Sequence, residues 1–401
     1  MDFYGYMRPN GKAGARNYVL LLPVNRSLNF IASSVERMTR NTRHFEIPAE
    51  TGRTEVDREV IARTLIGLMN NANVGGIVLL AVKSGAGSAY KNMCAERFEE
   101  EARKTGKPLR IVYLTNVGGS YNMLGETLRL TREVLLEVSD FRRENCPLSA
   151  LTLGVKCGTS DATSGIAGNP CVGAAFDQLI RAGGTAFFSE TTEIIGAEDL
   201  VAKRAVNESV AKKILSAARH WEDKAKATGE DIRKINPIPA NIAAGISSLE
   251  EKSLGAIAKS GTSPIQDVLK YAEMPKGSGL YFVDSWMSSL SLPLCLTACG
   301  ATIMLYQMGG GKIAQHPMMP SINPTVVSPF LYLTGNAVAY SRAPDNFDFD
   351  ASSIMTEGAS IPEMGTKLLE HLSAIASGTM TKMETLNYAE QLELYMEGPV
   401  L

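Results

Sequence analysis

Short apolar runs alternate with segments of helical periodicity along most of this chain, and this alternation constrains its fold more than any other feature. In the first part, apolar runs cover residues 18–24, 74–82 and 110–114, and each precedes a predicted helix. Strands that alternate with helices in this way predict a parallel sheet with crossover helices. We therefore predict an α/β lobe over residues 1–145.

The segment around Asn145 and Pro147 breaks the last of these helices and predicts a boundary between two lobes. A second alternation follows it, with four predicted strands at 150–155, 185–188, 280–284 and 301–306. We interpret residues 146–401 as a second, catalytic lobe. The predicted fold class is α/β, with two Rossmann-like or flavodoxin-like lobes and mainly parallel sheets. A chain of 401 residues is long enough for two such cores.

The charges of the chain are balanced, with 40 basic against 42 acidic residues. This composition provides no field of one sign to attract a nucleic acid or an anionic membrane, and it favours a small-molecule partner. The N-terminus has no apolar signal core, and no run of about 18 uncharged apolar residues occurs. The six cysteines lack CxxC spacing, so we expect reduced thiols and a cytoplasmic location.

Four polar or glycine-rich turns follow predicted strands of the second lobe, at residues 156–169, 189–193, 284 and 308–312. In a parallel sheet, ligands bind where strands end and helices begin, because backbone N–H groups converge there. A single turn of this kind most often has only a structural role, but four on successive units favour a binding site. We expect the turns at 156–164, 189–193 and 236–252 to meet around one pocket.

The first of these turns reads KCGTSDATSGIAGNP and combines a thiol, a carboxylate and four hydroxyl groups. Glycines let the backbone approach a ligand closely, and hydroxyl groups suit a carboxylate or a polyol. Cys157 is either a thiolate ligand of a metal or a small buried apolar residue. Asp161 is either an acid/base group or the cap of the helix that follows.

Two further pairs of charged residues have both a chemical and a structural interpretation. Glu190 and Glu193 are close enough to share a cation at a strand-to-helix turn, but Glu193 also suits the first turn of a helix. Glu251 and Lys252 are residue types that can remove a proton α to a carboxylate, or they form a solvated helix face. The four histidines lack ligand spacing, so a bound metal would need oxygen ligands and perhaps one thiolate.

Several segments resemble the altronate/galactarate dehydratase family over nearly the whole chain. They are GYMRPNGKAGARN, KCGTSDATSGIAGNP, SETTEIIGAED and NPIPANIAAGISSLEEKSLGAIAKSG. Within the family, CPLS, CGTSDATSG, VAKRA and YFVDS are most similar to the large subunit of sulfolactate sulfo-lyases. The resemblance implies elimination of water or sulfite from a 2-hydroxy acid, with Fe²⁺ as cofactor. It also implies a small SAF-type partner, fused in the dehydratases and separate in the sulfo-lyase; we further expect a homo-oligomer.

Loop position and motif together predict the site residues. The predicted catalytic residues are Glu251, Lys252 and Asp161. The predicted metal ligands are Cys157, Glu190 and Glu193. The residues predicted to bind substrate are Arg16, Asn17, Ser160, Thr163, Ser164, Asn169 and Lys312.

The chain also departs from the family motifs. Gly52 and Arg53 replace a Gly-Cys element, VKSGAG replaces Gly-x-Gly-Cys-Glu, and Ile242 stands where the family has lysine. The cations Arg53, Lys83 and Lys312 at or near such positions suit a more anionic substrate, such as a sulfonate or a dicarboxylate. The alternative function is a non-catalytic or regulatory subunit that binds an acid without converting it.

Overall fold

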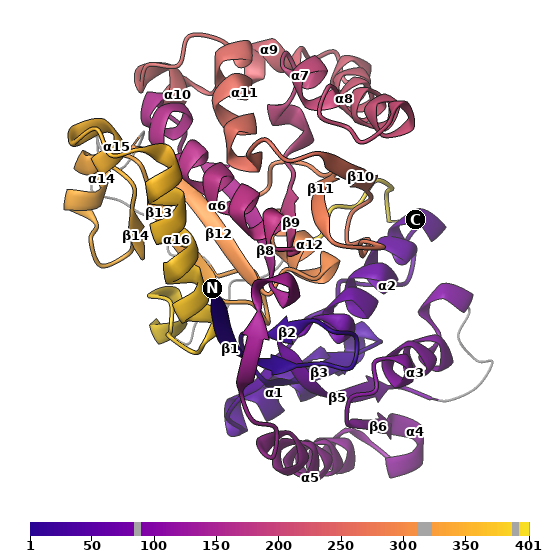
Figure 1. Cartoon of the computed structure of the whole chain (residues 1–401). Coiled ribbons are helices and arrows are strands. Elements are labelled where there is room, and N and C mark those ends of the chain that lie inside the picture. Colours follow the sequence, from indigo (N-terminus) through magenta and orange to yellow (C-terminus); the bar gives the residue numbers. More distant parts are fainter. Residues whose placement is uncertain (84–89, 311–322, 387–392, 401) are drawn as a thin grey trace.

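The computed structural model describes residues 1–83, 90–310, 323–386 and 393–400. Within these ranges the strands form two parallel sheets, of four and seven strands, and one antiparallel sheet of three. Apolar cores lie on both faces of each parallel sheet, with helices packed over them (Figure 1). The predicted α/β class with mainly parallel sheets is confirmed.

The first lobe is built on the four-stranded sheet, whose order β4-β3-β5-β6 is the flavodoxin-like order 2-1-3-4 along the chain. Its strands are β3 (Tyr18–Pro23), β4 (Thr42–His44), β5 (Val74–Ala81) and β6 (Leu109–Tyr113). Every residue of β5 is buried, as expected for a central strand with helices on both faces.

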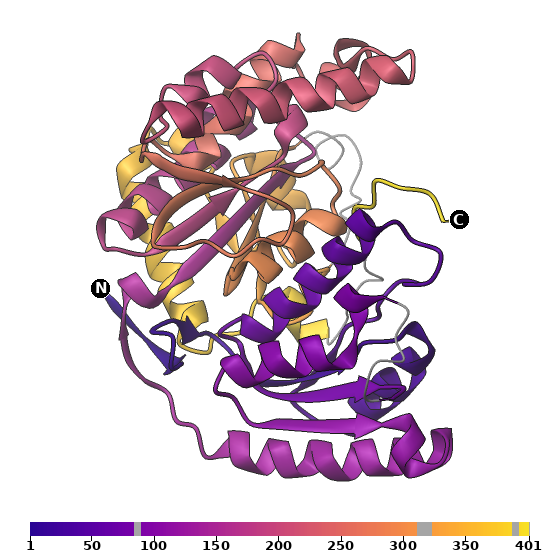
Figure 2. The same cartoon turned by 90° about the vertical axis from the view of Figure 1, so that its right-hand side faces the viewer.

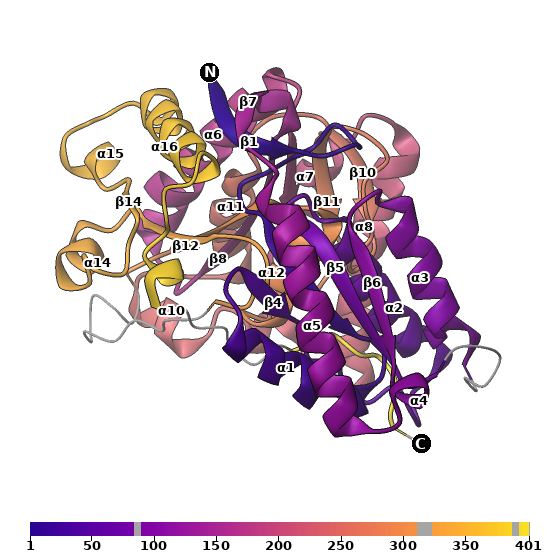
Figure 3. The ribbon, with the colours of Figure 1, turned by 90° about the horizontal axis from the view of Figure 1, so that it is seen from below.

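Four long helices cover this sheet. One face packs against α1 (Asn29–Met38) and α5 (Ser120–Ser139), and the other against α2 (Glu55–Asn70) and α3 (Ala95–Lys104). Figure 3 shows α5 lying across the first face, with the short α4 (Leu114–Val117) at its start.

The second lobe is built on the seven-stranded sheet, in which every strand is parallel to its neighbours. The order is β10-β11-β9-β8-β12-β13-β14. The strands are β8 (Thr152–Gly158), β9 (Thr185–Phe188), β10 (Ile265–Leu269), β11 (Gly279–Val283), β12 (Ile303–Met308), β13 (Phe330–Thr334) and β14 (Phe349–Asp350). Because the chain adds β9 on one side of β8 and later β12 on the other, β8 lies at the switch point where such sheets bind ligands.

Two layers of helices cover the second sheet. One face packs against α6 (Asn169–Arg181), α8 (Glu208–Ala227) and α16 (Ile361–Ala376), and the other against α12 (Ser291–Cys299) and α14 (Ala337–Arg342). Shorter helices connect these elements: α7 (Glu198–Ala202), α9 (Ile232–Ile235), α10 (Pro239–Ala243), α11 (Leu249–Ile257) and α15 (Ser353–Thr356).

The two lobes meet where α2 lies against α12, as Figure 2 shows. Gly67 makes this approach close, since a Cβ atom at this position would lie 2.2 Å from the carbonyl oxygen of Ala298. Asn71 at the end of α2 donates hydrogen bonds to the carbonyl groups of Thr297 and Ala301, at 2.9 Å each. The backbones of the two helices, one from each lobe, therefore lie in direct contact.

Both ends of the chain cross between the lobes. Strand β1 (Asp2–Met7) pairs with β2 (Ala13–Gly14) and with β7 (Glu144–Pro147), and it lies against α16 of the second lobe. At the other end, the backbone N–H groups of Glu397 and Gly398 donate to the Asp57 carboxylate in α2. The division at residue 145 stays a prediction, since both crossings cut across it. Among the described residues, no helix combines the length and apolarity needed to span a membrane.

Candidate active site

The ends of two adjacent strands, β8 and β9, bring the first site residues together. Cys157 is the penultimate residue of β8, and Glu190 follows β9 by two residues. Glu190 has a left-handed backbone conformation, with φ of 75°, although it is fully buried and is not glycine. A non-glycine residue in this region is strained and persists only where its surroundings fix it, which is common at functional sites.

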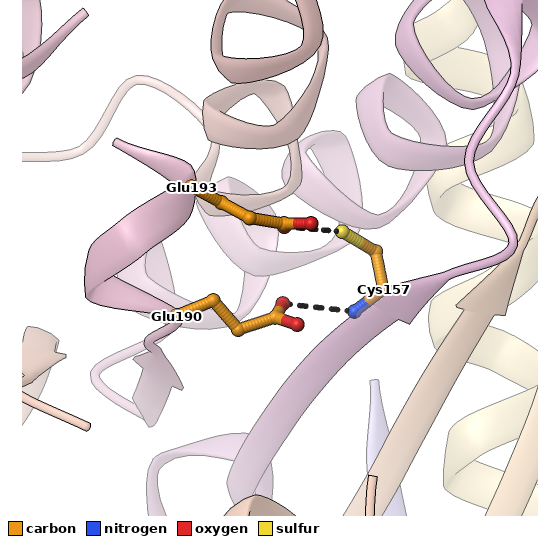
Figure 4. Close-up of side chains that lie close together, drawn as sticks. All are labelled: Cys157, Glu190 and Glu193. Carbon is orange, nitrogen blue, oxygen red and sulfur yellow. Dashed lines mark hydrogen bonds between the residues drawn. The ribbon is translucent and has the colours of Figure 1, made fainter. Parts of the chain in front are cut away.

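Cys157, Glu190 and Glu193 form a buried cluster, which Figure 4 shows. The Glu190 carboxylate accepts a hydrogen bond from the backbone N–H of Cys157, at 3.0 Å, and the thiol donates to Glu193 Oε2, also at 3.0 Å. One ligand atom from each residue lies within 4.8 Å of the other two. The three residues therefore have the composition and spacing of a metal-binding group.

Three lysines surround the same cluster. The Nζ atom of Lys259 lies 2.5 Å from Glu190 Oε2 and 3.2 Å from Glu193 Oε2. Lys156 Nζ lies 3.0 Å from Glu190 Oε1, and Lys252 Nζ lies 3.5 Å from Glu193 Oε1. All three lysines are buried, which is rare for this residue type unless it is paired.

These contacts set the charge states of the cluster. Burial opposes the ionisation of Glu193, but the charge of Lys259, followed by those of the other two lysines, outweighs it and lowers the pKa of this carboxyl to about 2. Burial also acts against the charge of Lys259, but its anionic neighbours raise the pKa of this ammonium group well above its ordinary value. Burial and the charges of Glu190 and Glu193 raise the pKa of the Cys157 thiol. The cluster thus combines an ionised Glu193 and a charged Lys259 with a thiol that resists ionisation.

The divalent iron that the resemblance implies does not fit this arrangement as it stands. Lys259 Nζ lies 3.1 Å from the Cys157 sulfur and within 3.2 Å of an oxygen from each glutamate. An ammonium group therefore contacts all three candidate ligand atoms. A cation bridging the same atoms would have to displace it.

A cavity of about 500 Å³ opens beside the cluster at the ends of the strands. Lys156, Glu190, Glu193 and Lys252 line it, together with Ser160 and Tyr306. A second cavity of about 290 Å³ shares Ser160 and Lys252 with the first. Charged groups of both signs thus face a space large enough for a small organic acid.

The three turns expected to meet around one pocket do meet. Asn241, in the third turn, donates to the backbone carbonyl of Ser160 in the first, at 2.9 Å. Lys252 donates to the side chain of Asn236, at 2.6 Å, and approaches Glu193 of the second turn. The Nδ atom of Asn236 is one of the buried polar atoms that has no hydrogen-bond partner among the described residues.

Asp161 organises the turns around the smaller cavity. Its Oδ1 accepts hydrogen bonds from the Thr163 hydroxyl and the backbone N–H of Ser164, at 2.7 and 3.1 Å. Its Oδ2 accepts from the N–H of Gly310 and the side chain of Asn336, at 2.7 and 2.9 Å. These contacts join the ends of β8, β12 and β13, and the catalytic role predicted for Asp161 stays a prediction.

Two other predicted substrate ligands of the first turn line the smaller cavity. They are Ser164 and Asn169, and both are buried. The turn itself differs from the predicted loop, because residues 164–168 form a wide helical turn that leads into α6. The side chain of Asn169 donates to the backbone carbonyl of Gly255 at 2.9 Å, which fixes α6 to α11, and its Oδ1 atom has no hydrogen-bond partner among the described residues.

Three of the predicted residues that the structure describes are not brought to the cluster. Glu251 lines the smaller cavity but is exposed, and its carboxylate accepts from the backbone N–H of Ser247, at 2.7 Å, at the start of α11. Arg16 is buried in a bidentate ion pair with Glu384 of the C-terminal region, with both bonds at 2.7 Å. Asn17 bonds Arg8 and the Val138 carbonyl, at 2.9 Å each. Lys312 lies outside the described residues.

The sequence prediction missed Lys259 and assigned no role to Lys156. Lys156 is next to the predicted thiol, and its side chain points to the opposite face of β8, over the ring of Tyr306 at 4.9 Å from Nζ to the centroid. Lys259 lies in a short helical turn after α11, at residues Ala258–Ser260. The sequence feature that could have identified Lys259 is that it is an isolated lysine in an alanine- and serine-rich segment. The burial of this lysine, however, depends on the tertiary structure.

Comparison with known proteins agrees with these observations. Residues 5–139 match the family described as D-galactarate dehydratase/altronate hydrolase, second domain. Residues 148–399 match the family described as D-galactarate/altronate dehydratase, C-terminal.

Individual relatives cover almost the whole chain. The (2R)-sulfolactate sulfo-lyase subunit beta of Chromohalobacter salexigens is 32% identical, over 97% of this chain and 96% of that protein. The altronate dehydratase of Bacillus subtilis is 29% identical, over 100% of this chain and 78% of that protein. The galactarate dehydratase (L-threo-forming) of Escherichia coli is also 29% identical, over 99% and 77%. The chain therefore belongs to the D-galactarate/altronate dehydratase family of lyases.

Proposed function

We propose that this chain is the large, catalytic subunit of a lyase that eliminates water or sulfite from a small anionic 2-hydroxy acid. The observation that carries the proposal is the cavity at the ends of β8 and β9. There two buried lysines, Lys156 and Lys252, face two buried carboxylates. Lysines in such a space suit the carboxylate or sulfonate of a substrate, and they can also transfer protons.

The reaction requires removal of the proton at C2 of the acid. The electron pair of that C–H bond forms the C2–C3 double bond, and the bond from C3 to oxygen or sulfur breaks with its electron pair on the leaving group. We assign the removal of the C2 proton to Lys252 Nζ, which accepts it as the neutral amine and which Asn236 Oδ1 holds at 2.6 Å. The enol that forms then takes up a proton at C3 and becomes the 2-keto acid. We assign the binding of the substrate carboxylate to Lys156. No step of this reaction uses a metal ion.

The relatives support both leaving groups. One relative is named a sulfo-lyase subunit beta and two are named dehydratases, so water and sulfite both remain candidates. The sulfo-lyase subunit is matched over nearly its full length, and its name places it in a complex of more than one subunit. We therefore include a separately encoded small subunit in the proposal.

Turnover assays with and without such a small subunit test the function. We expect the pair to release sulfite from sulfolactate, or a 2-keto acid from altronate or galactarate. Lys252→Met should lower turnover about 10²–10⁴-fold, as loss of a positioned acid–base group does. Glu251→Gln is the matched control, because this exposed neighbour is engaged with Ser247, and its turnover should stay close to that of the unmodified chain.

The outcomes separate the alternatives. If Glu251→Gln loses turnover and Lys252→Met keeps it, the assignment of the proton-transfer group is wrong. If the chain binds these acids and neither product forms in any combination, the regulatory, acid-binding function replaces the lyase.

A further inference from the structure

The ammonium group of Lys259 lies at the centre of the cluster formed by Cys157, Glu190 and Glu193. Its Nζ atom is 3.1 Å from the thiol sulfur and 2.5 and 3.2 Å from the two carboxylate oxygens. Its side chain is only 2% exposed. This one ammonium group therefore already contacts all three groups that could otherwise bind a metal ion.

The other lone pairs of the two carboxylates are also engaged. Glu190 Oε1 accepts from Lys156, and Glu190 Oε2 accepts from the backbone N–H of Cys157 as well as from Lys259. Glu193 Oε2 accepts from the thiol, and its Oε1 faces Lys252 at 3.5 Å. Each carboxylate oxygen therefore contacts a cation of the protein, and a metal ion would have to replace at least one of these contacts.

The charges around the cluster also argue against a bound metal ion. Three buried lysine side chains face the two buried carboxyl groups, and Lys259 contacts both of them. A divalent ion added to these groups would concentrate several positive charges in a buried space, where an uncompensated charge is highly unfavourable. Lys259 already supplies a positive charge to both carboxylates at the position that such an ion would occupy.

The position of Lys259 is fixed by its surroundings. The turn that follows it is held by Asp177 of α6, whose carboxylate accepts from the backbone N–H groups of Thr262 and Ser263, at 2.9 Å. Gly261 has a φ of +66°, and a Cβ atom there would lie 2.5 Å from the carbonyl oxygen of Gly173. The backbone after Lys259 thus packs directly on α6, and Lys259 is not a surface lysine free to swing away.

We propose that the Lys259 ammonium group takes the place of a metal ion in this cluster, so that the site is assembled without a bound divalent cation. Lys259 does not line the cavity, and it acts as a positioning residue behind the groups that do. It holds the two carboxylates and the thiol together at the ends of β8 and β9. This inference is independent of which acid is the substrate.

Cobalt binding tests the proposal, because Co²⁺ bound by a thiolate has a strong charge-transfer absorption. We expect the unmodified, metal-free chain to show no such absorption at one equivalent of Co²⁺. Lys259→Met removes the bridging ammonium group and should create a site for one Co²⁺ per chain. The absorption should disappear when Cys157→Ser is added to that variant, since the sulfur is its source.

Lys252→Met is the matched control, since it removes a neighbouring charge but leaves Lys259 bridging the cluster. It should bind no more Co²⁺ than the unmodified chain. The proposal is overturned if the unmodified chain binds one Co²⁺ with a thiolate absorption that Cys157→Ser abolishes. It is also overturned if Lys259→Met and Lys259→Gln both fold, by circular dichroism, and gain no site. If neither variant folds, the unmodified chain decides: the proposal holds if it is purified without a bound metal and shows no thiolate absorption with Co²⁺. The proposal is overturned if it carries a metal or shows that absorption.

Discussion

The two lobes share one architecture but differ in what their strand ends hold. In the first lobe, the described end of β5 is closed by the side chain of Asn25, which accepts from the backbone N–H of Val82 at 3.1 Å. In the second lobe, the ends of β8 and β9 hold two buried carboxylates, a thiol and three buried lysines. Among the described residues, the two lobes thus share a parallel α/β fold but differ in the ionisable groups near their strand ends, and a function is argued from such groups and not from the fold.

This difference has an energetic consequence. The first sheet is stabilised by two apolar cores, and its described ion pairs are partly exposed. The cluster of the second lobe is stable only because its opposite charges compensate one another. Removing one partner leaves a buried charge without its counterion, which destabilises a protein far more than the loss of a surface pair.

The largest predicted effect compares a buried with an exposed glutamate. Glu190→Gln leaves Lys156 and Lys259 with a neutral partner, and we expect it to lower the free energy of unfolding by about 3–5 kcal/mol. The control is Glu59→Gln, which breaks the half-exposed pair with Arg97 in the first lobe. That variant should lose at most about 1 kcal/mol. Urea unfolding measures both, and equal losses would show that burial of charge does not distinguish the lobes.

The next effect concerns the junction between the lobes. Gly67→Ala places a Cβ atom against the backbone of Ala298, so α2 and α12 must separate. We expect a loss of about 1–3 kcal/mol, typical of overpacking. Gly125→Ala in α5 is the control, since nothing lies within 4 Å of its added Cβ atom. It should stabilise the protein by about 0.5–1 kcal/mol through helix propensity. Thermal unfolding measures both variants. Melting temperatures that shift in the same direction would contradict the predicted difference between the two positions.

A smaller effect concerns the turn that carries Lys259. Burial opposes the ionisation of Asp177, but hydrogen bonds from Ser263 and Thr262 outweigh it and lower the pKa of this carboxyl. A depressed folded-state pKa contributes stability above the ordinary pKa of the group, and this stability is lost as pH falls through the folded value. Asp177→Asn should cost about 1 kcal/mol at neutral pH and remove that part of the acid dependence. The measurement is the unfolding midpoint of the variant and of the unmodified chain from pH 7 into the acid range. The assignment is refuted if the midpoint of the variant falls with pH as steeply as that of the unmodified chain.

The smallest predicted effects compare the pH dependence of stability at one histidine from each lobe. Burial disfavours the charge of His44, but Glu36 and Glu46 outweigh it and raise its pKa; burial, with Lys382, lowers the pKa of His371. His44 therefore contributes stability at low pH that is lost as pH rises through its folded pKa, and His371 contributes stability at high pH that is lost as pH falls. His44→Gln and His371→Gln should change the slope of stability against pH in opposite directions around pH 6.5. Midpoints that shift alike in both variants would refute this contrast.

Much of the fold was predictable because strands buried on both faces are continuous apolar runs. This holds for β5, β8, β11 and β12, which the sequence analysis located. It fails for β10, whose three central residues are only half-buried and include Gln266 and Asp267.

The site was predicted in part for the same physical reason. Cys157, Glu190 and Glu193 follow strands that prove to be neighbours, and parallel neighbours end at one edge of a sheet. Arg16 belongs to a motif, but its partner Glu384 is 368 residues away. Lys252 lines the larger cavity and Glu251 does not, which depends on the rotation of α11, because successive residues of a helix point about 100° apart.

The sequence by itself determined the alternation of strands and helices, the turns at the strand ends and the family, because all three are written in local patterns of apolar, polar and glycine residues. Only the tertiary structure decided which ionisable groups are buried together. The packing of α6 against the turn after α11 places Lys259 among the carboxylates. The charge and contacts of a buried side chain depend on partners from distant segments, and no local pattern contains them.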